Sequence, residues 1–124
     1  MSIDIIKLNR GDSYEFSIII PDKTNKYKNY LLTAKDTVYF ALMYPNQRFE
    51  DAVILKGYDL KDQNPDDGTI TFKLKPNDTR PLTPGIYYYT VKLQCGGTAG
   101  IIDDSDEPDE VRTLVERTKF ILNE

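Results

Sequence analysis

The sequence predicts an all-β fold: an antiparallel, two-sheet β-sandwich of about seven strands in a single domain covering residues 1–124. Apolar residues recur at every second position in most segments, which is the period of a half-buried strand. These segments are separated by Gly, Pro, Asn and Asp, the residues of tight turns. No segment combines a sustained 3.6-residue apolar period with helix caps, so long helices are not expected.

The expected strands follow one another along the chain. Residues 3–8 (IDIIKL) and 13–20 (SYEFSIII) come first, and residues 37–44 (TVYFALMY) are apolar on both faces, which predicts a central strand covered on both sides. Residues 51–58 (DAVILKGY) form a less regular strand, and residues 68–75 (GTITFKLK) alternate cleanly. The inward-facing residues expected in the second and fifth of these segments are Tyr14, Phe16, Ile18, Ile20, Ile70, Phe72 and Leu74.

The chain closes with residues 111–122 (VRTLVERTKFIL). Leu114, Phe120 and Leu122 are the expected inward anchors of this strand, which can accommodate a bulge near Glu116. Two long connections, residues 21–36 and 96–110, lie between predicted strands and should run over the surface.

Residues 82–95 (LTPGIYYYTVKLQC) place three tyrosines after a Pro–Gly pair. In a strand, Tyr87 and Tyr89 share one face, which suits a core, and Tyr88 takes the other, mixed face. A tyrosine just after such a turn is typical of immunoglobulin-like sandwiches, where its hydroxyl bonds to the preceding backbone. We therefore expect an immunoglobulin-like fold with a corner tyrosine, rather than a tyrosine platform that stacks a ligand.

Composition excludes several functions. The chain has no histidine, which removes the usual general base, the usual zinc ligand and every Ser–His or Cys–His nucleophile. A net charge of -4 argues against general nucleic-acid binding. Cys95 is the single cysteine, so no disulfide can form within the chain, and it is expected to be small and partly buried. The first residues lack a signal-peptide pattern, which predicts synthesis in a cytoplasm.

An acidic run lies in the second long connection, DDSDEPDE. Its spacing lacks the glycine and terminal glutamate of an EF-hand, so a bound metal is not expected. A long connection of one charge can be a solvated loop or a contact for a basic partner surface. The candidate partner-contact residues are Asp103, Asp104, Asp106, Glu107, Asp109 and Glu110.

Two other motifs have simpler explanations. Arg10-Gly11-Asp12 spells an integrin-binding tripeptide, but a turn between the first two strands also needs this glycine. Residues 23–30 (KTNKYKNY) mix lysines with tyrosines, as single-stranded nucleic-acid sites do, although a surface loop is the expected role in an acidic chain. Neither motif is assigned a function.

Four segments in order match one further pattern: a first strand with an RGD turn, G-x-I-x-F-x-L, L-x-x-G-x-Y-x-Y-x-V-x-L, and a last strand with T-x-x-x-x-x-x-F-x-I. The matching positions are Arg10-Gly11-Asp12; Gly68, Ile70, Phe72 and Leu74; Leu82, Gly85, Tyr87, Tyr89, Val91 and Leu93; and Thr113, Phe120 and Leu122. The sequence thereby resembles small virion-associated proteins of tailed phages and prophages of Gram-positive bacteria. It is also similar to the N-terminal β-sandwich modules of some phage baseplate proteins.

The resemblance implies a structural, non-enzymatic virion protein of the head, neck, tail or baseplate, made in the host cytoplasm. It implies contacts with other virion proteins and with further copies of the chain, with no cofactor, small-molecule substrate or membrane. The acidic run is longer than the hairpin expected there, which suggests a contact specific to this protein. The alternative is an immunoglobulin-like binding module for a host-surface polymer or protein, with Tyr27, Tyr30 and Tyr88 as its aromatic residues.

Overall fold

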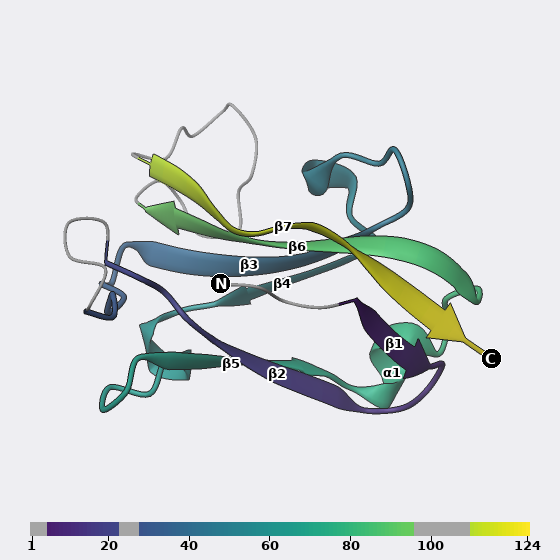
Figure 1. The fold of residues 1–124 in the computed structure, drawn as a ribbon, viewed down its shortest axis with the longest axis horizontal. Helices are drawn as coiled ribbons and strands as arrows, with labels where there is room; N and C mark the ends of the chain where they lie inside the picture. The colour runs from purple at the N-terminus through teal and green to yellow at the C-terminus, as the bar shows by residue number, and fades with distance from the viewer. Residues whose placement is uncertain (1–4, 23–27, 96–109) are drawn as a thin grey trace.

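A computed structural model describes residues 5–22, 28–95 and 110–124 (Figure 1). These residues form mostly strands, with one short α-helix and two single 3-10 turns, so the all-β prediction is confirmed. No helix in these ranges is long and apolar enough to span a membrane. The elements are β1 (Ile6–Asn9), β2 (Tyr14–Ile19), β3 (Asp36–Met43), η1 (Phe49–Asp51), β4 (Ile54–Tyr58), η2 (Leu60–Asp62), β5 (Thr69–Leu74), α1 (Pro76–Thr79), β6 (Gly85–Cys95) and β7 (Glu110–Asn123).

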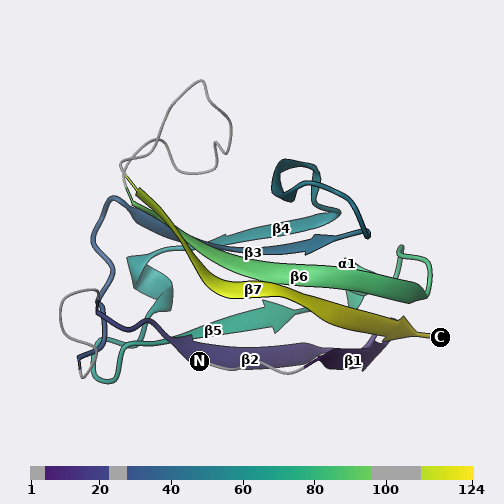
Figure 2. The ribbon, with the colours of Figure 1, turned by 45° about the horizontal axis from the view of Figure 1, so that its top comes forward.

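The strands form two sheets that lie one against the other (Figure 2). The larger sheet has the order β1-β7-β6-β3-β4, and the smaller contains β2 and β5. The core lies between them, because alternate residues of both sheets point inward. Phe16 of β2, for example, packs edge-on against Phe40 of β3, with ring centroids 5.9 Å apart.

The expectation that all strands pair antiparallel is wrong at one edge: β1 pairs parallel with β7. The cause is the turn after β1, which takes the chain from the larger sheet to the smaller and so prevents a hairpin with β2. In this turn the Asp12 amide donates to the Asn9 carbonyl (3.0 Å), and Gly11 has the positive φ of +87° that glycine adopts without strain. Arg10-Gly11-Asp12 is therefore the connection expected between the first two strands.

The alternation predicted along β6 is confirmed. Tyr87 and Tyr89 are fully buried in the core, whereas Tyr88 lies half-buried on the outer face. The Tyr87 hydroxyl donates to the carbonyl of Thr83, four residues earlier, over 2.5 Å. This bond ties the start of β6 to the turn before it, as expected for a corner tyrosine.

Strand β3 is buried on both faces, as its sequence predicts. The smaller sheet covers its inner face. Its outer face is covered by the connection to β4, where the ring of Phe49 meets Tyr39 edge-on at 6.4 Å. The second apolar face of this strand is therefore covered by a local loop and not by a further sheet.

Strand β7 contains the predicted bulge. Thr118 pairs with Tyr89 and Val115 with Val91, so Glu116 and the residue after it face a single residue of β6. The resulting shift in register makes Val115 the buried residue, while Leu114, an expected anchor, packs only partly buried against the core. Counting every second residue from Phe120 predicts that Leu114 faces the core. The extra residue in the bulge moves Val115 to that position instead.

Replacing Tyr87 with phenylalanine tests the bond at the corner of β6. The Tyr87→Phe variant should lose about 1 kcal/mol of unfolding free energy, because the Thr83 carbonyl loses its donor while the ring still fills the core. Urea denaturation measures the difference. Tyr88→Phe is the matched control and should stay within about 0.5 kcal/mol of the wild type; equal losses in both variants contradict the assignment.

Candidate functional site

The acidic run predicted as a partner contact lies almost wholly outside the described residues. Asp103, Asp104, Asp106, Glu107 and Asp109 fall between residues 96 and 109, and Glu110 is described only as the first residue of β7. The two strands that flank the run are paired with each other: Cys95 at the end of β6 pairs with Glu110 at the start of β7. The run therefore leaves from one end of the larger sheet.

At the opposite end of the same sheet, apolar and basic side chains share the outer face. Lys7, Ile121 and Ile86 are paired across β1, β7 and β6, and the neighbouring row pairs Lys119 with Tyr88. The residues between these two rows, such as the buried Phe120, point to the core. The side chains of the two rows themselves therefore lie on the outer face.

Two of these isoleucines are unusually exposed for their size. Ile86 is 51% exposed, and Ile5, which precedes β1 on the same side as Lys7, is 50% exposed. We name the set the isoleucine–lysine face: Ile5, Lys7, Ile86, Lys119 and Ile121. A group of apolar side chains left in water is typical of a contact surface.

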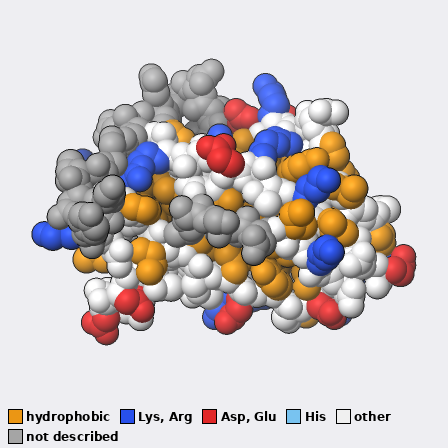
Figure 3. Space-filling view, in the orientation of Figure 1, with side chains coloured by type: hydrophobic (Ala, Val, Ile, Leu, Met, Phe, Trp, Pro, Cys, Tyr) orange, Lys and Arg blue, Asp and Glu red, His pale blue; other side chains and the backbone are white. Residues whose placement is uncertain are grey.

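The charge of this face is positive. Among the described residues, neither Lys7 nor Lys119 has an ion-pair partner, and no carboxylate stands in either row. Figure 3 shows Lys and Arg side chains interspersed with hydrophobic ones on the right of the molecule, where β1 and the end of β7 lie. The chain is acidic overall, so a face whose charged side chains are lysines differs from the general balance.

Arg117 forms one border of the face and holds it in place. Its guanidinium lies over the ring of Tyr88, 5.6 Å from the centroid, and donates to the Gln47 carbonyl over 2.8 Å. It also reaches the sulfur of Met43 at 3.5 Å. These contacts tie the bulge of β7 to the connection after β3, so Tyr88 is half covered by protein.

The tyrosines proposed for a polymer site are not brought together. Tyr27 lies outside the described residues, and Tyr30 and Tyr88 lie near opposite ends of β3. The hydroxyl of Tyr30 donates to the buried carboxylate of Asp36 over 2.5 Å, which turns it inward. Tyr30 therefore supports the fold at its own end of the sheet, far from Tyr88.

Asp36 is the centre of a buried polar group. Its carboxylate also accepts from the Thr33 amide at 2.9 Å. Burial alone favours the protonated acid, but the bonds from Tyr30 and Thr33 outweigh burial and hold the pKa of Asp36 below its ordinary value. Burial, followed by the bond to Asp36, raises the pKa of Tyr30. Cys95 is half-buried nearby, as predicted.

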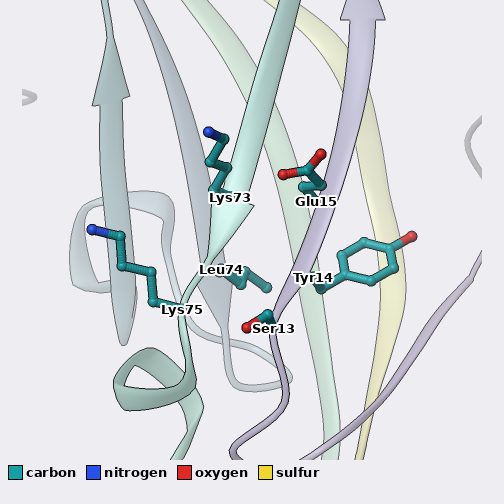
Figure 4. A pocket seen from close by; sticks show the side chains of 6 residues that line it. All are labelled: Ser13, Tyr14, Glu15, Lys73, Leu74 and Lys75. Carbon is teal, nitrogen blue, oxygen red and sulfur yellow. The ribbon is translucent and has the colours of Figure 1, made fainter.

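Two shallow grooves flank the end of β5 and share Lys73 and Lys75. One, of about 370 Å³, is lined by both strands of the smaller sheet and is shown in Figure 4, where Glu15 stands beside Lys73. The other lies toward β4. There the amine of Lys56 crosses between the sheets and donates to the Lys73 carbonyl (2.9 Å) and to Asp78 (2.6 Å). Lys56, which lines the second groove, is thus held by an ion pair with Asp78.

Two of these polar contacts could not be predicted from local sequence patterns. Lys56 looks like an ordinary exposed lysine of an irregular strand, yet it pairs with Phe40 and points inward. Gln63 is buried, accepts from the Leu32 amide at 2.8 Å and donates to the carbonyls of Tyr30 and Gly68. Both roles depend on segments far apart in the chain.

Across the described ranges, no group of three or more Cys, Asp or Glu side chains is placed to hold a metal ion. Comparison with protein-family models, with curated proteins and with solved structures finds no significant match to this chain. The isoleucine–lysine face is therefore judged on its own geometry and chemistry.

Acid stability tests the Asp36 group. Because the pKa of Asp36 lies below its ordinary value of 3.8 in the folded chain, its contribution is complete above that pH and is lost as pH falls through the folded pKa. Asp36→Asn should lose about 1–3 kcal/mol of unfolding free energy at pH 7 and show a smaller further loss below pH 4. Urea denaturation from pH 7 to pH 2 measures both, and parallel pH curves for the two proteins contradict the assignment.

Removing the Lys56 amine tests the ion pair between the sheets. Lys56→Met keeps the aliphatic stem but leaves Asp78, which is partly buried, and the Lys73 carbonyl without this donor. The expected cost is about 1–2 kcal/mol of unfolding free energy. Lys75→Met, on the exposed side of the groove, is the matched control and should change stability by less than about 0.5 kcal/mol.

Proposed function

We propose that the chain is a structural, non-enzymatic virion protein of a phage or prophage, an assembly subunit of the head, neck, tail or baseplate. The observation that carries the proposal is the isoleucine–lysine face. It exposes large apolar side chains on the rigid, paired strands of the larger sheet, next to lysines without described partners. Apolar centres with a polar border are typical of protein–protein interfaces.

The fold supports the same proposal. We infer an immunoglobulin-like frame from the order β1-β7-β6-β3-β4 opposite β2-β5, together with the bond from Tyr87 to the backbone before its strand. Such a frame serves as a scaffold for contacts made by faces, edges and loops. The four segments that resemble phage virion proteins are the same strands and turns that build it.

Detection in particles tests the function. Particles from a host that carries the gene are purified by density gradient, and their proteins are identified by mass spectrometry. The chain should be present in fixed proportion to other structural proteins. Its absence from intact, infective particles contradicts the proposal.

A variant of the face sharpens the test. Ile86→Glu places a charge among the isoleucines without touching the core, and it should reduce incorporation about tenfold or more, equivalent to about 1.4 kcal/mol. Leu60→Glu, at an exposed leucine of η2 away from the face, is the matched control and should be incorporated normally. Equal incorporation of both variants would show that the face makes no assembly contact.

A further inference from the structure

We infer that the isoleucine–lysine face binds an acidic surface of a different virion protein, one whose carboxylates surround an apolar centre. This inference rests on the proposed assembly function and names the chemistry of the partner. All the residues that carry it lie on β1, β6 and β7 or directly beside these strands.

The centre of the face is apolar and its border is polar. Ile86 and Ile121 are paired across β6 and β7, and Lys7 completes their row on β1. Two positions further along β1 and β7, Asn9 pairs with Asn123 on the same side of the sheet, and both are exposed. An apolar centre within a polar border is the usual composition of a protein–protein interface.

The charged groups of this border are cations. Lys7 and Lys119 have no ion-pair partner among the described residues, and Arg117 donates to backbone carbonyls. Glu124, the carboxylate that follows β7, is already paired with Arg10 over 3.2 Å. A partner that brings carboxylates to Lys7 and Lys119 supplies the missing opposite charge, which favours association and fixes its orientation.

The same face of a second copy does not fit this requirement. In a two-fold contact the face would meet itself, so both sides would bring the same residues. Neither row contains a carboxylate, and both sides would therefore bring only cations. Like charges placed together in a contact reduce affinity. The partner surface must therefore differ from this face in composition.

The arrangement of the side chains favours a protein partner over a lipid surface. Isoleucines and lysines stand side by side on paired strands, and the lysine side chain is the longer of the two. The amines would meet lipid headgroups before the isoleucines could enter the acyl layer, whereas membrane-binding segments place their apolar side chains deepest. A protein surface can match this relief, with an apolar centre that reaches the isoleucines and carboxylates around it.

Photo-crosslinking in assembled particles tests the inference. The photo-reactive residue p-benzoylphenylalanine replaces Ile5, which is 50% exposed at the border of the face, so the central isoleucines stay intact. Particles that contain the full-length variant chain are purified and irradiated, and mass spectrometry identifies the crosslinked segment. We expect a segment of a different virion protein in which Asp and Glu clearly outnumber Lys and Arg.

Charge variants test the complementarity directly. Lys7→Glu with Lys119→Glu should reduce both crosslinking and incorporation about tenfold or more. Lysine substitutions at the carboxylates of the crosslinked segment should restore both. Lys73→Glu with Lys75→Glu makes the same charge change on the smaller sheet and should leave both unchanged. Circular dichroism confirms that each variant is folded.

Several results would overturn the inference. These are a crosslink to a segment without net negative charge, to lipid, or to this chain itself in the same or a second copy. The absence of any crosslink, or normal incorporation of the Lys7 and Lys119 variant, would do the same. Any of these results with the chain still present in purified particles removes the partner assignment alone. Absence of the chain from the particles contradicts the proposed function itself.

Discussion

The alternation of side chains along β6 is the constraint on which the rest of the structure depends. Its inward residues, Tyr87 and Tyr89, are buried between the two sheets, and the ring of Tyr89 stacks on Phe40 at 5.9 Å. A shift of one residue would expose both tyrosines and bury Tyr88 and its neighbours in their place. The pairing with β3 and β7 is thereby fixed on both sides, and the outward residues are fixed with it.

Local patterns in the sequence were sufficient for the faces of most strands. Tyr87, Phe72 and Ile18 point inward as alternation predicts, because each lies in a strand without a bulge at that point. The parallel pairing of β1 with β7 could not be read in this way, since it joins Ile6 to Phe120 across the length of the chain. Val115 was missed for a different reason, because the bulge shifts the period within the strand itself.

The candidate face was only partly visible in the sequence. Alternation placed Ile86 and Tyr88 on the outer side of their strand, but nothing local indicated that Lys7 and Ile121 would stand beside Ile86. That row exists because the turn at residues 9–12 sends β2 to the other sheet and leaves β1 to pair with the last strand. The same crossover leaves a sheet of two strands. Lys56 points inward from β4, the edge strand of the larger sheet, toward β5. Inward-pointing charges on edge strands are one way in which proteins prevent edge-to-edge pairing with other chains.

Charge is distributed unevenly along the larger sheet. The chain has a net charge of -4, yet its lysines at one end of the larger sheet face no described carboxylate, and its acidic run leaves from the other end. The separation of about 30 Å along β6 greatly exceeds the screening length of about 8 Å at physiological salt. Charges held at the two ends of the described sheet therefore interact only weakly with each other.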